Sequence, residues 1–121
     1  CGTIVFSPVF FDSVPAKLKA FVDRTQAFYA SKFILKEPSI ARYKKRFGLL
    51  ISLGGSKPYE TQFLGNKVSM EFFFKCINTK LLNHLQESDI DNLPVWERQK
   101  FLDDLEQEIE NLVKNVKSSM C

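Results

Sequence analysis

One segment near the middle of the chain constrains the fold most strongly. Residues 47–53 read Phe-Gly-Leu-Leu-Ile-Ser-Leu, an almost unbroken apolar run, and Gly54-Gly55-Ser56 follows it directly. A strand without polar alternation is typical of a parallel sheet that is covered on both faces. Two adjacent glycines at its end predict a tight turn or a close approach to a ligand, because neither residue carries a Cβ.

Two further strands are predicted, one on each side of this run in the sequence. Residues 3–6 are apolar and partly β-branched, which predicts a parallel strand covered on both faces, and Ser7-Pro8 ends it. Residues 79–85 form a shorter and more polar segment, which suits a strand at the edge of the sheet.

Apolar residues at three- and four-residue steps predict three helices. The first begins at Asp12 or Ser13 and continues to about Phe33, and the second runs from about Lys67 to Phe73 after an interruption at Gly65-Asn66. A long terminal helix follows Pro94. The alternation predicts a single α/β domain over residues 1–121, a three-layer sandwich in which helices cover both faces of a parallel sheet.

The charge of the chain argues against a nucleic-acid partner. Its 17 Lys and Arg residues exceed the 14 Asp and Glu residues by only three. The one basic cluster, Arg42 to Arg46, is interpreted as a solvated connection between elements, and a phosphate-contacting patch is the alternative. No apolar run reaches the ~20 residues that cross a bilayer, and no secretory leader pattern stands at the start, so we expect neither membrane insertion nor secretion.

Single residues with reactive side chains carry little signal. Cys1, Cys76 and Cys121 are odd in number and form no Cys-x-x-Cys pair, which predicts neither disulfides nor a metal site and suits a cytoplasmic setting. Cys76 is interpreted as a small core residue. His84 has no Ser, Cys or carboxylate at a telling spacing, so a polar role at a strand end is favoured. Trp96 is expected to anchor the last helix. The three residues 72–74, all Phe, are interpreted as core residues and a possible oligomer contact rather than as a cofactor site.

Two loops follow the predicted strands at their carboxyl ends, where open parallel sheets bind ligands. They are Ser7-Pro8-Val9-Phe10-Phe11 and Gly54-Gly55-Ser56. Aromatic side chains beside free backbone N–H groups would suit a flat cofactor.

Residues 2–24 also resemble a known family. Their strand, Ser7-Pro8-Val9-Phe10 loop and Leu18-Lys19-Ala20-Phe21-Val22-Asp23-Arg24 helix are similar to the NAD(P)H-dependent FMN reductases, and most of all to the iron–sulfur flavoprotein branch. The resemblance implies a flavodoxin-like fold. It places Ser7, Pro8, Val9, Phe10 and Phe11 along the flavin ring and Gly54, Gly55 and Ser56 near its pyrimidine end. Phe10 stands where the family usually has Tyr, so a hydroxyl is missing.

The resemblance implies an FMN-binding oxidoreductase that passes electrons from NAD(P)H through FMN to a flavin, a quinone or another acceptor. The flavin performs the redox chemistry, so no side chain is expected to act as a catalytic acid or base. A flavodoxin-type electron carrier is one alternative. An incomplete domain that acts only as an assembly module is another.

Family members begin with a strand, a phosphate-binding loop and a second strand with its helix, which nothing before Cys1 supplies. We therefore expect the chain to match the last two thirds of such a domain, without the first two strands. The open edge of the strand at residues 3–6 would then pair with upstream sequence or with another copy, and a homo-oligomer is the expected assembly.

Overall fold

The computed structural model describes residues 1–119 and contains one parallel sheet. Its strands β1 (Gly2–Pro8), β2 (Phe47–Leu53) and β3 (Lys80–Glu87) lie in the order β1-β2-β3. Gly2 pairs with Phe47 at one end of the β1–β2 ladder and Pro8 with Leu53 at the other, while the β2–β3 register shifts between Gly48 and Leu49. The predicted α/β arrangement and the parallel pairing of all three strands are confirmed.

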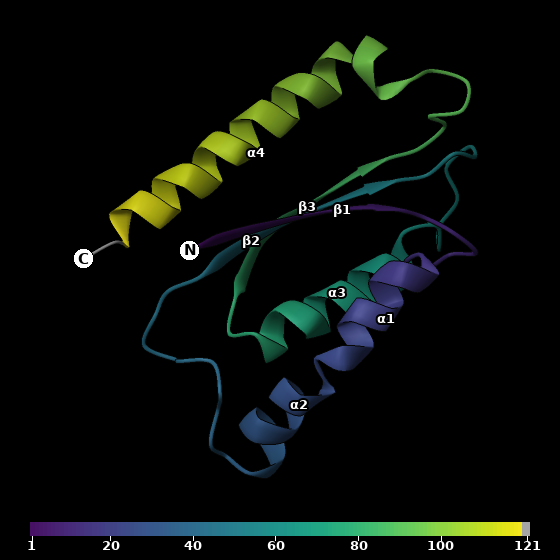
Figure 1. Cartoon of the computed structure of the whole chain (residues 1–121). Helices are drawn as coiled ribbons and strands as arrows, with labels where there is room; N and C mark the ends of the chain where they lie inside the picture. Colours follow the sequence, from purple (N-terminus) through teal and green to yellow (C-terminus); the bar gives the residue numbers. More distant parts are fainter. Residues whose placement is uncertain (120–121) are drawn as a thin grey trace.

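Helices cover both faces of this sheet (Figure 1). Helices α1 (Ala16–Arg24) and α3 (Leu64–Cys76) lie on one face, with the short helix α2 (Gln26–Tyr29) and a π-helical turn (Ala30–Ile34) continuing from α1. Helix α4 (Gln99–Ser118) lies on the other face and follows a 3₁₀ turn (Val95–Glu97).

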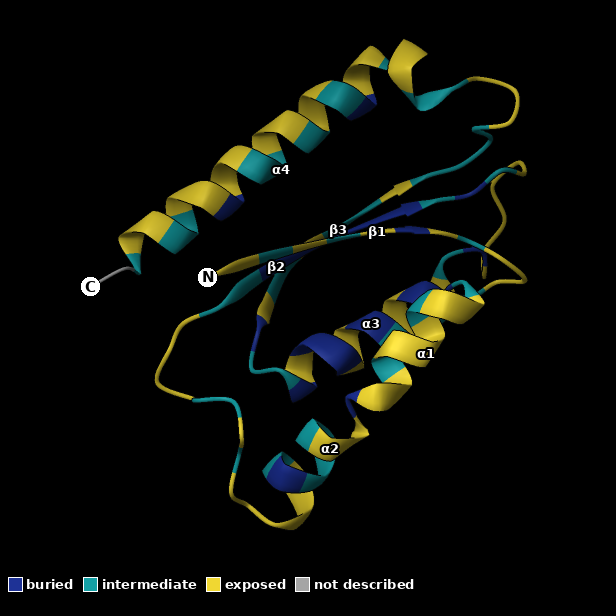
Figure 2. Ribbon diagram, in the orientation of Figure 1, coloured by how far each residue is buried: buried dark blue, intermediate teal, exposed yellow. Residues whose placement is uncertain are grey.

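Strand β2 is buried along almost its whole length (Figure 2). The Leu50 side chain packs on the α1–α3 face with Val14, Met70, Phe73 and Phe74. Leu49 and Ile51 pack on the opposite face with Phe101 and Leu112. Because successive side chains of a strand point to opposite faces, two helix layers favour a nearly unbroken apolar run in this strand.

Strand β1 differs from the prediction that both of its faces would be covered. Val5 packs into the α1–α3 core, but Ile4 is 41% exposed and Phe6 is 56% exposed on the other face. Helix α4 packs mainly over β2 and β3, and at the start of β1 its Leu112 and Val116 lie close to Gly2. The face of β1 on the α4 side is therefore largely open to solvent.

Two helix predictions were wrong in detail. The first predicted helix breaks at Thr25, whose hydroxyl donates to the Val22 carbonyl at 2.5 Å. Helix α3 includes Gly65 and Asn66 in its first turn, where an interruption was predicted. At Gly65 a Cβ would collide with the carbonyl oxygen of Asp12, so this glycine is needed for close packing of the preceding loop on the helix.

Other single-residue predictions gave mixed results. Cys76 is buried as expected, and so are Phe73 and Phe74, but Phe72 is half exposed. Strand β3 lies at the sheet edge as predicted, although it is longer than the segment 79–85. Trp96 is 76% exposed and does not anchor the last helix. Cys121 lies outside the described residues.

In the part of the chain that is described, no helix has the length and apolarity to cross a membrane.

Gly48 provides a test of the packing around β2. A Cβ at this position would lie 2.6 Å from the nearest ring carbon of buried Phe74. We expect Gly48→Ala to lower the free energy of unfolding by about 2 kcal/mol, as overpacking of a core does. Urea denaturation measures the change. Gly2→Ala is the control, because its Cβ would meet only side-chain carbons at 3.3 Å or more; an equal loss in both variants would contradict the packing.

Candidate functional site at the carboxyl edge of the sheet

The two loops predicted to bind a ligand lie side by side in the structure. Pro8 pairs with Leu53 at the end of the β1–β2 ladder, and the Val9 N–H donates to the Leu53 carbonyl at 2.9 Å. Val9 thus begins its loop next to the point where Gly54 leaves β2. The carboxyl edge of the sheet brings the predicted segments 7–11 and 54–56 together, as parallel pairing of adjacent strands requires.

Phe11 lies at the tip of a tight reverse turn. Phe10 and Ser13 exchange two backbone hydrogen bonds, at 2.9 and 3.2 Å, and the two residues between them have positive φ, 49° at Phe11 and 58° at Asp12. Such turns favour Asn-Gly, because a bulky side chain with positive φ is strained by about 1–2 kcal/mol. Phe10 is 59% exposed and Phe11 is fully exposed.

Contacts from the next loop and helix hold this turn in place. The Tyr59 hydroxyl donates a hydrogen bond to the Asp12 carboxylate, and this bond raises the pKa of Tyr59. The Asp12 carbonyl oxygen rests on Gly65 at the start of α3. Neither contact involves the Phe11 side chain. The surrounding structure therefore holds the strained turn in place, while the Phe11 ring at its tip packs against nothing. Strain of this kind is often found at functional sites.

The loop 54–56 presents backbone donors at the same edge of the sheet. Its three carbonyl groups accept hydrogen bonds from the N–H groups of residues 89–91, and the Gly54 N–H donates to Glu87. The N–H groups of Gly55 and Ser56 have no acceptor among residues 1–119. The loop is therefore rigidly attached to the end of β3, yet two of its donors remain available.

Side chains of the chain itself approach the two glycines of this loop closely. A Cβ at Gly54 would collide with the amide of Gln62, and one at Gly55 would lie 2.5 Å from an Asp91 carboxylate oxygen. The buried Gln62 amide donates to Ser56 and accepts from the Ser88 hydroxyl at 2.7 Å. The close approach predicted from the Gly-Gly pair is present, and the approaching groups are Gln62 and Asp91.

Ser7 points inward rather than toward the edge. It is 1% exposed, and its hydroxyl donates to the Pro8 carbonyl and accepts from the Asn66 amide at 3.2 Å. The same amide donates to Ser52, which pairs with Ser7 in the sheet, also at 3.2 Å. The Oδ1 atom of Asn66 is buried and accepts no hydrogen bond from the described residues. The Ser7 side chain thus belongs to a buried network below the loops.

His84 is part of this network, although no partner for it was predicted. Its Nε2 lies 2.7 Å from Ser52 Oγ, and Gln86 Nε2 lies 3.2 Å from its Nδ1. With Gln86 as donor, the ring proton lies on Nε2 and is donated to Ser52. Burial, with a smaller effect of Lys67, lowers the pKa of His84 to about 4, so the ring is neutral at pH 7. Ser52 is completely buried, which rules out a nucleophilic Ser–His pair.

Sequence reasoning missed Ser52, Asn66 and Gln62, and one signal for the first of them was present. Ser7 and Ser52 are each a hydroxyl residue near the end of an otherwise apolar strand. Pairing two such strands in parallel brings both hydroxyls to the same level of the sheet. Asn66 and Gln62 come from α3 and the loop before it, and nothing in their local sequence indicates burial.

The edge carries an exposed surface rather than a deep pocket. Five hollows on the described surface are lined by residues other than the eight predicted ones. Across residues 1–119, no three His, Cys, Asp or Glu side chains are grouped so that they would hold a metal ion. The site consists of exposed Phe10 and Phe11, the N–H groups of Gly55 and Ser56, and the Asp91 carboxylate beside Gly55.

The lowered pKa of His84 predicts how stability depends on pH. Between pH 6.5 and about 4 the unfolded chain binds a proton at this residue and the folded chain does not. Folding stability is therefore complete above pH 6.5 and falls, by about 2 kcal/mol, as the pH approaches 4. Urea denaturation across this range measures the loss. In His84→Gln this contribution should vanish, and an equal pH slope in both proteins would contradict it.

Comparison with protein-family models, with curated proteins and with solved structures finds no match to the chain. The resemblance of residues 2–24 to the FMN reductases therefore remains an expectation about fold and cofactor. The geometry of the carboxyl edge, with its strained aromatic turn and free N–H groups, is what the functional proposal rests on.

Proposed function

We propose that the chain is a flavodoxin-like domain that binds FMN and passes electrons from NAD(P)H through FMN to a flavin, a quinone or another acceptor. One observation carries the proposal: a strained turn presents the fully exposed Phe11 ring at the same carboxyl edge of the sheet that carries the free N–H groups of Gly55 and Ser56. A large exposed aromatic side chain on strained backbone needs an explanation outside the fold, because it stabilises nothing within it.

The topology supports the fold part of this proposal. In flavodoxin-like sheets the strand order is 2-1-3-4-5, so the last three strands are neighbours in sequence order. Strands β1, β2 and β3 have this order, run parallel and carry helices on both faces. Ligands of such sheets bind outside the carboxyl ends of the strands, which is the edge where Phe11 and Gly55 lie.

The chemistry of the edge fits a flavin ring. Phe10 and Phe11 offer apolar aromatic surface for stacking on the isoalloxazine. The pyrimidine end of that ring alternates carbonyl acceptors with an N–H donor. Gly55 and Ser56 supply two backbone donors, and the exposed Asp91 carboxylate beside Gly55 supplies an acceptor. The residues present thus match both the flat face and the polar end of the cofactor.

In this proposal the protein positions the ring and the cofactor reacts. FMN, when bound, accepts a hydride from the nicotinamide and releases electrons to the acceptor. Phe10 and Phe11 orient the ring, and Gly55 and Ser56 hold its polar end. A flavodoxin-type carrier would use the same surface without hydride transfer. Rapid mixing of the FMN complex with NADPH distinguishes the two, because only the reductase loses flavin absorbance directly.

Phe11→Gly tests the ring contact. Glycine adopts positive φ without strain, and the Phe11 side chain packs on nothing, so we expect the free energy of unfolding to rise by about 1 kcal/mol. We expect FMN affinity to fall roughly 5- to 10-fold, because about 1–1.5 kcal/mol of aromatic stacking is lost. Quenching of flavin fluorescence measures the affinity, and urea denaturation measures stability.

Tyr43→Gly is the matched control, because Tyr43 is 83% exposed in the connection before β2, at the other end of the sheet. Its FMN affinity should equal that of the unaltered chain. Riboflavin should bind nearly as tightly as FMN, since the proposed contacts are to the ring. Unchanged affinity in Phe11→Gly, or equal losses in both variants, would contradict the site.

The open edge of β1 favours a second candidate function, assembly with another copy of the chain. The seven residues of β1 pair with no strand among residues 1–119 on this side, none of them is charged, and Ile4 and Phe6 are exposed on one face. Natural edge strands of this length usually carry charges, prolines in mid-strand or bulges that prevent pairing. A two-fold axis would pair β1 with its own copy antiparallel and bring Ile4 and Phe6 against their equivalents.

Phe6→Lys tests this assembly. A charge on the exposed face of β1 should prevent pairing, so the unaltered chain should be a dimer at micromolar concentration and Phe6→Lys a monomer. Light scattering coupled to gel filtration measures the mass. Leu64→Lys is the control, since Leu64 is also about half exposed but lies on α3. A monomeric unaltered chain would exclude the second copy as the partner of this edge.

A further inference from the structure

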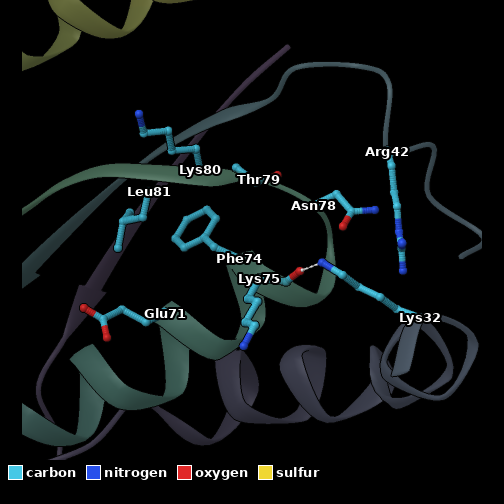
Figure 3. Close-up of a pocket in the computed structure, with 9 residues that line it drawn as sticks. All are labelled: Lys32, Arg42, Glu71, Phe74, Lys75, Asn78, Thr79, Lys80 and Leu81. Carbon is cyan, nitrogen blue, oxygen red and sulfur yellow. Dashed lines mark hydrogen bonds between the residues drawn. The ribbon is translucent and has the colours of Figure 1, made fainter. Parts of the chain in front are cut away.

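A hollow lies at the opposite end of the sheet from the proposed flavin site. Its volume is about 770 Å³, and it opens between the end of α3, the start of β3 and the segments that carry Lys32 and Arg42 (Figure 3). Strand β2 has seven residues, so the hollow is about 20 Å from Gly54 at the carboxyl edge. It is therefore separate from the flavin site.

Positive charge dominates the lining. The residues that line it include four with cationic side chains, Lys32, Arg42, Lys75 and Lys80, and one with a carboxylate, Glu71. The two ion pairs found among residues 1–119 involve none of these five side chains. Burial is the largest cause of the lowered pKa of Lys32; repulsion from Arg42 and, to a smaller extent, Lys75 lowers this pKa further, and Cys76 acts in the opposite direction. An anion in the hollow would offset this repulsion.

Two cations and an amide gather on one side of the hollow. Arg42 and Lys32 lie on the same side, with Asn78 next to them, whereas the Lys80 ammonium group points away (Figure 3). Lys32 Nζ donates to the Lys75 carbonyl at 2.5 Å, which fixes its position and leaves two further N–H donors. The Asn78 amide donates to the Ile40 carbonyl at 2.7 Å and thereby ties the Arg42 segment to the end of α3.

Arg42 is the residue for which the fold provides no role. Its guanidinium makes no hydrogen bond to any residue in 1–119, whereas the neighbouring Arg46 donates to the carbonyls of Ala41 and Lys44. A planar guanidinium with all its donors available matches two oxygens of a phosphate at once. The two arginines of the basic segment 42–46 thus differ in role: Arg46 stabilises the fold, and Arg42 lines the hollow with its donors free.

We propose that this hollow binds the phosphate group of a small phosphorylated molecule, with Arg42 and Lys32 as its principal contacts. The Lys75 side chain adds positive charge, and Leu81 gives the organic part of the ligand an apolar wall. The volume lies within the usual 300–1,000 Å³ of small-molecule sites. A nucleic-acid chain would instead need a stripe of cations along the surface, and here the cations surround one hollow.

Isothermal titration with inorganic pyrophosphate, in buffer free of other phosphates, tests the site. We expect saturable binding with one site per chain. Arg42→Gln should weaken it at least ~10-fold, as loss of a charge-assisted contact does. Lys45→Gln is the matched control, because it removes the same charge from the same segment at a residue that does not line the hollow. Its affinity should change by less than about 2-fold.

Three results would overturn the proposal. The first is absence of saturation with pyrophosphate in the unaltered chain. The second is an equal loss of affinity in Arg42→Gln and Lys45→Gln, which would indicate general surface charge. The third is tighter binding of a short single-stranded oligonucleotide that both variants weaken alike, which would assign the segment to nucleic acid. Thermal unfolding serves as the folding control: Arg42→Gln should melt at the temperature of the unaltered chain, because the Arg42 side chain is exposed and makes no hydrogen bond within residues 1–119.

Discussion

The burial of β2 on both faces is the constraint on which the rest of the structure depends. Leu49, Leu50 and Ile51 are completely inaccessible to solvent. Leu50 packs in the core on one face of the sheet, and Leu49 and Ile51 pack in the core on the other. A strand of this kind is stable only between two layers of helices, so α1 and α3 on one side and α4 on the other follow from it. The parallel direction of its neighbours places all three carboxyl ends at one edge.

At that edge, hydrogen-bonded residues inside the protein support loops whose aromatic side chains are exposed to solvent. Ser7, Ser52, Asn66 and His84 form a buried polar network just beneath it, and the hydrogen bonds of the loop 54–56 attach it to the end of β3. Above this base, Phe10 and Phe11 are presented to solvent on a turn held by Tyr59 and Gly65. Rigid support under exposed contact groups is what a cofactor site needs, because little order then has to be gained on binding.

Much of the fold could be predicted from the sequence because its signals are local. The apolar run at 47–53 and the periodic face of α4 each contain their own pattern, and both elements formed where expected. The prediction for β1 was wrong because the cover of its second face depends on where α4 lies, which no local pattern encodes. The predicted interruption at Gly65 was wrong for a similar reason. Gly65 lies within α3 because it packs closely against Asp12, a contact between distant parts of the sequence that local propensity does not encode.

The candidate site was predictable only in outline. The strand ends identified the two loops, and parallel pairing brought them together, but Ser7 proved to be buried and the positive φ of Phe11 has no sequence signature. An NMR titration with riboflavin tests the central claim most directly. The account predicts contacts between flavin ring protons and Phe11, with shifts of the Gly55 and Ser56 amide signals. Saturable binding that shifts other regions and leaves these three residues unchanged would contradict it.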